Sequence, residues 1–320
     1  MRRRRARRGR ALLLVALASI TATAVWLLVA GTTSDTSTRS ASLATPPALK
    51  HRANHVRPSG KAPPPGIDLF GARPVRVHFR HPPRAGLLFD LKSGQVLWAH
   101  RPLRRLPIAS ITKIMTAILV VERTTPTDTV HMTREAFHYQ GSGVGVLPHH
   151  RRMPIEGLMD GMLLPSGNDA ALALADHVAG TAHRFARLMN QRARAMGLGC
   201  THYVSPDGIE DSNRSCAADL AALSRVAMAK PRIARVVRQE SAHPRFPVKG
   251  GHLWLYSTNP LLRMGYRGTI GLKTGSTNRA GHCFVGVVRR GSRTYGVVLL
   301  HSPDTGRQSK KLFDAAFRIR

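Results

Sequence analysis

The sequence predicts an α+β fold in which helices flank an antiparallel sheet. Strand patterns stand at both ends of the folded region, with a hairpin at residues 86–98 and a strand pair at 283–288 and 295–300. Helical patterns fill the stretch between them, and a last amphipathic helix is expected at 306–317. Strands on either side of a helical block favour one sheet that both ends of the domain share.

The individual elements follow from local patterns. Leu91-Lys92-Ser93-Gly94 separates two apolar runs and is typical of a hairpin turn that contains glycine. Arg290-Gly291-Ser292 takes the same place between the last two strands. Helices are predicted at residues 109–122, 155–164, 169–179, 182–196 and 217–229.

The first 31 residues predict a membrane segment. Residues 1–10 are rich in Arg, and residues 11–31 form an apolar run without a charge. About twenty apolar residues in a helix span the roughly 30 Å of a bilayer core, and the preceding Arg cluster favours a cytoplasmic N-terminus. We interpret the run as a signal-anchor. The alternative is a signal peptide cleaved near the small residues at 21–24, and both place the rest of the chain outside the cytoplasm.

The remainder divides into a spacer and one folded domain. Residues 32–84 are rich in Ser, Thr, Pro and Arg without a sustained hydrophobic period, which predicts a disordered or semi-extended spacer. A flexible chain of that length reaches about 40 Å. Residues 85–320 are expected to fold, and 42% hydrophobic residues in the whole chain are enough for a core.

Positive charge runs through the whole chain. Residues 1–84 carry 16 basic and 2 acidic side chains, a net +14, and residues 85–320 carry the other 33 and 15, a net +18. A basic arm on a neutral domain is therefore excluded, and an anionic partner is expected. Export removes intracellular nucleic acid from the possible partners, and the low aromatic content of 5% argues against base stacking. An anionic membrane and an anionic cell wall remain as the expected partners.

Cysteine and histidine give weaker signals. The three cysteines leave at least one free thiol, and Cys200 and Cys216 are a possible pair that their spacing does not force. No metal site and no cofactor are predicted, because CxxC and HExxH are missing and His149-His150 and the other histidines lack ligand spacing.

Three short motifs carry the chemistry: Ser110-Ile111-Thr112-Lys113, Ser166-Gly167-Asn168 and Lys273-Thr274-Gly275. Positions i and i+3 of a helix share a face, so Lys113 is expected beside the Ser110 hydroxyl as its base. A second cation nearby, for which Lys273 is the candidate, and an apolar surround are both expected to lower the pKa of Lys113. Each motif alone has a simpler interpretation, such as a helix cap or a turn. All three in order behind an export segment make coincidence improbable.

The similarity extends beyond the motifs. Residues 107–116, 157–171, 196–209 and 271–281 resemble segments of the serine-type D-alanyl-D-alanine carboxypeptidases, the low-molecular-mass penicillin-binding proteins of peptidase family S11. The resemblance covers about residues 85–320. It implies the β-lactamase/DD-peptidase-like fold, with a sheet flanked by helices, a helical subdomain, and the active site at their junction.

The resemblance also implies a mechanism. Ser110 would attack the carbonyl between the two terminal D-alanines of a peptidoglycan stem peptide, and Lys113 would take its proton. Ser166 would relay a proton to the leaving D-alanine. β-Lactam antibiotics would acylate Ser110 and stay. The protein would act from the outer face of a bacterial plasma membrane, or as a secreted enzyme if the signal is cleaved.

Five further residues are expected to bind the substrate. Asn168 would hold the substrate amide, and Lys273 and Thr274 would meet its terminal carboxylate. Gly275 would let the substrate lie against the strand edge. The backbone N–H groups of Ser110 and Ser276 would form the oxyanion hole.

Three alternatives remain open. A D,D-endopeptidase uses the same machinery and cannot be separated by sequence. A β-lactamase is less favoured, because between Asn168 and Lys273 only Glu210 and Glu240 are available as a deacylating base, and neither has a fitting context. A non-catalytic wall-binding module would need neither Ser110 nor Lys113.

Two departures from the family are visible. The chain ends about 45 residues after the third motif, so the second β-rich domain and C-terminal membrane helix of many members are expected to be absent. Residues 149–152, His-His-Arg-Arg, replace a small turn, which bears on local substrate contacts and not on the reaction.

Overall fold

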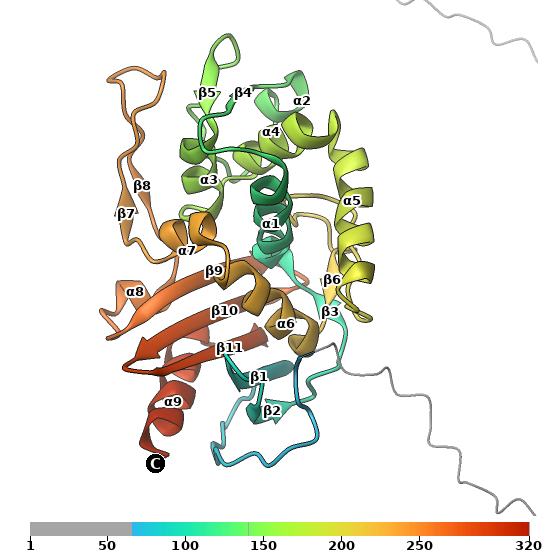
Figure 1. Ribbon diagram of the computed structural model, residues 1–320, viewed down its shortest axis with the longest axis vertical. Coiled ribbons are helices and arrows are strands. Elements are labelled where there is room, and N and C mark those ends of the chain that lie inside the picture. Colours follow the sequence, from blue (N-terminus) through green and yellow to red (C-terminus); the bar gives the residue numbers. More distant parts are fainter. Residues whose placement is uncertain (1–65, 140, 320) are drawn as a thin grey trace, which may run out of the picture. The chain divides into compact units, whose positions relative to one another are not determined.

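The computed structural model describes residues 66–139 and 141–319 (Figure 1). The predicted basic segment 1–10, the apolar segment 11–31 and residues 32–65 of the spacer lie outside these residues. The strands are β1 (Ala85–Asp90), β2 (Val96–His100), β3 (Leu106–Pro107), β4 (Thr129–His131), β5 (Arg152–Pro154), β6 (Arg214–Ser215), β7 (Ser241–Ala242), β8 (Leu255–Tyr256), β9 (Thr269–Thr277), β10 (Gly281–Arg290) and β11 (Arg293–Ser302). The helices are η1 (Ala109–Thr112, a 3₁₀ turn), α1 (Lys113–Arg123), α2 (Arg134–Phe137), α3 (Ile155–Leu163), α4 (Asn168–Ala179), α5 (Ala182–Ala195), α6 (Ala217–Met228), α7 (Pro231–Val237), α8 (Pro260–Arg263) and α9 (Thr305–Arg318).

Both ends of the folded domain build its main sheet. Within the described residues, β1, β2, β9, β10 and β11 form an antiparallel sheet in the order β2-β1-β11-β10-β9. The central pairing joins β1 to β11, where Leu87 faces Val298 across the ladder. The sheet predicted from the two ends of the domain is therefore confirmed.

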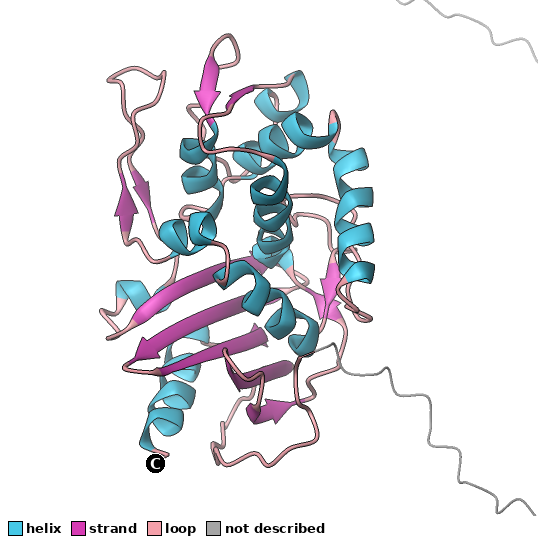
Figure 2. Ribbon diagram, viewed as in Figure 1, coloured by secondary structure: helices cyan, strands magenta, loops and turns pink. Residues whose placement is uncertain are grey.

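Helices cover both faces of this sheet (Figure 2). Successive side chains of a strand point to opposite faces, and the strands read as continuous apolar runs because both faces are buried. On β11, Val297 and Leu299 pack with α9, whereas Val298 and Leu300 belong to the larger core on the side of α1 and α6. The larger core continues into the helical part that holds α3, α4 and α5. The sheet and the helices thus share one continuous interior.

The folded region begins earlier than the predicted boundary at residue 85. Ile67, Leu69 and Val75 are buried, and the Val75 N–H donates to the Leu97 carbonyl at 3.1 Å. The Trp98 indole N–H donates to the Val77 carbonyl at 3.3 Å. Isolated apolar residues among Pro and Arg show no period, so this stretch was predicted as spacer although it packs beside β2.

The predicted helix at 109–122 is divided. Its first four residues form the 3₁₀ turn η1, and the α-helix starts only at Lys113. Side chains at i and i+3 eclipse in a 3₁₀ turn, so the tighter winding places Lys113 directly over Ser110. The remaining predicted helices match α3, α4, α5, α6 and α9 to within a residue or two at each end.

Two further features complete the fold. Cys200 and Cys216 form a disulfide with 5.6 Å between their Cα atoms, and Cys283 is a free, buried thiol. Across residues 66–139 and 141–319, none of the helices combines the length and the apolar character needed to cross a bilayer.

A chain that begins at residue 85 is expected to unfold at a lower temperature than one that begins at residue 66. Removing Ile67, Leu69 and Val75 exposes core surface worth about 1.5–3 kcal/mol per side chain as an upper bound. The midpoint should fall on the order of 10 °C in a thermal scan. Phe70→Ala is the matched control, because this side chain is 83% exposed. Equal midpoints for the two chain lengths would contradict the corrected boundary.

Candidate active site

The first motif places a serine hydroxyl against a buried amine. Ser110 lies in η1 and lines a cleft, and the Lys113 Nζ lies 2.9 Å from its Oγ. Lys113 is completely buried and has two more acceptors in the described structure, the Asn168 Oδ1 and the Asp207 carbonyl at 2.7 Å. The amine is therefore surrounded by three hydrogen-bond partners, and the Ser110 hydroxyl is one of them.

Burial sets the proton affinity of this lysine. Removal from water lowers the pKa of Lys113 from 10.5 to about 8, although the carboxylates of Asp207 and Asp169 act in the opposite direction. The predicted apolar surround is therefore the main cause of the shift. Burial, and then repulsion from Lys113, hold the pKa of Lys273 well below its ordinary value.

The second motif forms a strained loop between α3 and α4. Ser166 has a φ of +73°, the left-handed region, which costs a non-glycine residue of order 1 kcal/mol. The Gly167 N–H donates to the Gly161 carbonyl at 2.9 Å and anchors the turn. Ser166 lines the same cleft as Ser110, and Asn168 begins α4 beside Lys113. The loop therefore brings both of its predicted residues to the first motif.

The third motif lies within a strand. Lys273, Thr274, Gly275 and Ser276 belong to β9, the edge strand beside η1. Lys273 is buried and donates to the Thr274 carbonyl at 3.0 Å. Thr274, Gly275 and Ser276 line the cleft together with Ser110. All eight predicted site residues are thus gathered around one cleft of about 400 Å³, except that Lys113 and Lys273 lie beneath its surface.

Gly275 is required for a reason that differs from the predicted one. A Cβ at this position would lie 2.9 Å from the Ser110 nitrogen and 3.0 Å from the Ile108 carbonyl oxygen. Its missing side chain therefore allows β9 to pack against the backbone of η1, and room for a substrate is not the main constraint. The close approach brings the backbone of the two elements together beside Ser110.

Three residues that support the site were not assigned a role from the sequence. The Tyr139 hydroxyl accepts from Asn168 Nδ2 at 2.6 Å and orients the amide so that its oxygen faces Lys113. The Asp207 carbonyl accepts from Lys113. The Thr258 hydroxyl lies 2.6 Å from the Thr274 hydroxyl. The backbone N–H of Thr258 donates to the Leu164 carbonyl.

A signal existed for part of this set. Thr258 lies in Ser257-Thr258-Asn259, which has the same Ser-x-Asn pattern as the second motif. The Asp207 segment was recognised as similar to the family, but a backbone carbonyl leaves no mark in residue type. Nothing in the sequence around Tyr139 points to Asn168, which is 29 residues away.

Metal ligands do not gather at this cleft. Among the described residues, the one cluster of side chains that could ligate a metal is Cys200, Cys216 and Asp219. Both of its sulfur atoms are joined in the disulfide. The chemistry that this cleft offers is that of a serine nucleophile with an amine base.

Comparisons with known proteins agree with this geometry. Residues 78–303 match the D-alanyl-D-alanine carboxypeptidase family, Peptidase_S11. The chain is 35% identical to the D-alanyl-D-alanine carboxypeptidase DacB2 of Mycobacterium tuberculosis over 74% of this chain and 83% of that protein. It is 29% identical to the D-alanyl-D-alanine carboxypeptidase DacF of Bacillus subtilis over 74% of this chain, but spans only 62% of that longer relative.

Solved structures support the same conclusion. The crystal structure of the Streptomyces K15 DD-transpeptidase superposes with a TM-score of 0.70 at 28% identity, covering 76% of this chain and all of that one. The fold predicted from the resemblance is therefore confirmed. The family match spans well over half of the residues, and the chain belongs to the D-alanyl-D-alanine carboxypeptidase family of serine peptidases.

Proposed function

We propose that this chain is a serine-type D-Ala-D-Ala carboxypeptidase that removes the terminal D-alanine from peptidoglycan stem pentapeptides. The observation that carries the proposal is the 2.9 Å contact between the Lys113 amine and the Ser110 hydroxyl inside a cleft. Membership of the family supports the substrate class. β-Lactams, which mimic the terminal dipeptide, are proposed to acylate the same serine.

The surroundings of Lys113 favour its action as a base. A neutral amine has two N–H groups and one lone pair. The Asn168 oxygen and the Asp207 carbonyl accept the two N–H groups, which leaves the lone pair directed at the Ser110 hydroxyl. Ser110 then attacks the carbonyl carbon between the two D-alanines while its proton passes to Lys113.

The acyl transfer completes in two stages. The C–N bond breaks as Ser166, which lines the cleft, relays a proton to the leaving amine. An ester on Ser110 remains, and water hydrolyses it to the shortened peptide. The developing oxyanion is proposed to accept from the backbone N–H groups of Ser110 and Ser276, whose elements the missing Cβ of Gly275 allows to approach closely.

One end of the cleft suits a terminal carboxylate. Thr274 and Thr258 contribute adjacent hydroxyl groups, and Lys273 lies buried beside them as a potential cation. The terminal D-alanine is therefore proposed to leave from the Thr274 end. Asn168 is proposed to hold the peptide amide on the acyl side. It would donate the second hydrogen of its Nδ2, because the first is donated to Tyr139.

A second activity deserves a test because one similar structure is named a DD-transpeptidase. The acyl-enzyme could pass its acyl group to an amine of another stem peptide instead of water. Product analysis with and without an added amine acceptor separates the two outcomes, because transfer yields a new amide and hydrolysis yields a free acid.

We also propose that the enzyme works outside the cytoplasm, tethered to a bacterial plasma membrane by residues 11–31. The disulfide between Cys200 and Cys216 supports an oxidising compartment. The full chain is expected to sediment with membranes and to be cut by protease added to spheroplasts. Loss of residues 1–31 should leave the chain inside the cell. Cytoplasmic retention of the full chain would contradict the proposal.

Replacing Ser110 by alanine should abolish covalent labelling by fluorescent penicillin and D-alanine release from a pentapeptide. The ester cannot form without the hydroxyl, so both signals should fall by at least about 10³-fold. Ser93→Ala is the control, because that serine is exposed and lies in the hairpin turn between β1 and β2. Residual label on a folded Ser110→Ala protein would point to another nucleophile.

The rate of acylation should rise with pH. Only neutral Lys113 can take the proton, and its pKa is about 8, so the neutral fraction grows about tenfold per pH unit below that value. The second-order rate constant for penicillin labelling is expected to climb from pH 6 and level off above about pH 8. A flat profile across this range would exclude Lys113 as the titrating base.

A further inference from the structure

A carboxylate directly after the second motif receives the backbone of a neighbouring loop. Asp169, the second residue of α4, accepts from the Val144 N–H at 2.8 Å and, through its other oxygen, from the Gly145 N–H at 2.9 Å. Its own helix adds the Ala170 N–H at 2.7 Å. Hydrogen bonds to an ionised acceptor are stronger than those between neutral groups. Asp169 is only 7% exposed, and it is not among the eight residues assigned to the reaction.

The loop at 142–145 meets the second motif at further points. The Asn168 N–H donates to the Ser142 carbonyl at 3.1 Å. A Cβ on Gly167 would lie 2.7 Å from the Val144 side chain, so the missing side chain of this glycine leaves room for the valine. The loop and the second motif therefore pack as one unit.

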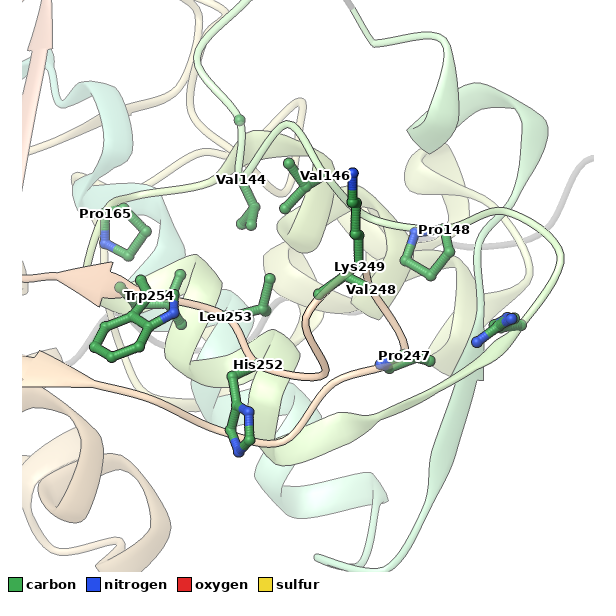
Figure 3. Close-up of a pocket in the computed structure, with 13 residues that line it drawn as sticks. Val144, Val146, Pro148, Pro165, Pro247, Val248, Lys249, His252, Leu253 and Trp254 are labelled. Atoms are coloured by element: carbon green, nitrogen blue, oxygen red, sulfur yellow. The ribbon is translucent and has the colours of Figure 1, made fainter.

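The same loop borders two spaces. Ser142 lines the catalytic cleft, and Gly143 and Val144 line a separate cavity of about 720 Å³. Figure 3 shows Val144 and Val146 beside this cavity, across from Leu253. Ser142 and Gly143 are exposed, so the hydrogen bonds of the neighbouring residues, and not burial of these two, hold this wall of the cleft in place.

Asp169 also acts on the base. Burial lowers the pKa of Lys113 to about 8, and the negative charges of Asp207 and Asp169 oppose this by favouring the protonated amine. Burial, and then repulsion from Lys113, lower the pKa of Lys273 on β9, and burial raises the pKa of the Tyr139 phenol. Asp169 thus belongs both to the loop and to the charges that surround the base.

We propose that Asp169 is a positioning residue for the reaction, which fixes the loop at 142–145 as a wall of the cleft and takes part in the charge balance around the Lys113 amine. The inference rests on the proposed carboxypeptidase function and adds a residue to the machinery of that site. Asp169 does not line the cleft, so it acts through the loop backbone and through Lys113. One side chain thereby governs both the fit of the peptide and the pH range in which the base is neutral.

The charge is tested with Asp169→Asn, which keeps the shape of the side chain. Loss of the carboxylate favours the neutral amine, so the pKa of Lys113 should fall below its present value of about 8. The rise of the penicillin-labelling rate constant with pH should therefore move to lower pH by about half a unit or more. Asp176→Asn is the matched control. This carboxylate lies about two turns later on α4 and accepts from the Thr133 hydroxyl at 2.5 Å, so its loss should leave the midpoint unchanged.

The loop is tested without a change of charge by Gly143→Ala. A Cβ at this position would lie 2.7 Å from Asp169 Oδ2, so the loop must shift away from the carboxylate. KM for a peptide ending in D-Ala-D-Ala should rise by about threefold or more, whereas the pH midpoint of penicillin labelling should stay at the parental value. Gly199→Ala is the control, because a Cβ there meets open space.

The outcomes separate the inference from the proposed function. A folded Asp169→Asn enzyme with the parental pH profile would overturn the inference, and so would a Gly143→Ala enzyme with the parental KM. If Asp169→Asn does not fold, Gly143→Ala alone decides, because Gly143 is exposed. A parent enzyme that takes no penicillin at all would instead remove the proposed function.

Discussion

The site depends on how closely the edge strand β9 approaches the turn η1. Gly275 makes the approach possible, because even one added carbon would press on the backbone of Ser110 and Ile108. The sheet is built from both ends of the folded domain, whereas η1 leads into the helical part through α1. The missing side chain of Gly275 thus lets the sheet and the helical part pack closely together, with the cleft between them.

The two buried lysines follow from that junction. Helix α1 starts at Lys113 and points its amine into the space between the sheet and α4, while Lys273 on β9 enters the same interior. Water is excluded from both, and two ammonium groups so close together repel. The carboxylates of Asp207 and Asp169 moderate the shift of Lys113, which leaves an amine with a pKa of about 8 that gains and loses a proton near physiological pH.

Sequence patterns predicted the parts of this arrangement that are local. Apolar periodicity located the main strands and helices, and three short motifs located the nucleophile, the base and the substrate-binding strand. Patterns could not predict contacts that depend on the three-dimensional path of the chain. Tyr139 meets Asn168 across 29 positions, and Asp207 contributes a backbone oxygen that any residue would have. The segment at 66–84 lacks a period, so its packing beside β2 was missed.

Reactivity and selectivity are divided between two kinds of structure in this protein. Lys113 and Lys273 are buried in the interior, where any change in size or charge disturbs the core that carries them. Trp254 and Lys249 are exposed on the hairpin that carries β7 and β8, although Phe246, Leu253 and Leu255 of the same hairpin are buried in the larger core. Side chains on such loops can change at little cost to stability. Exposed side chains around the cleft can therefore differ while the buried residues that hold the serine and its base stay the same.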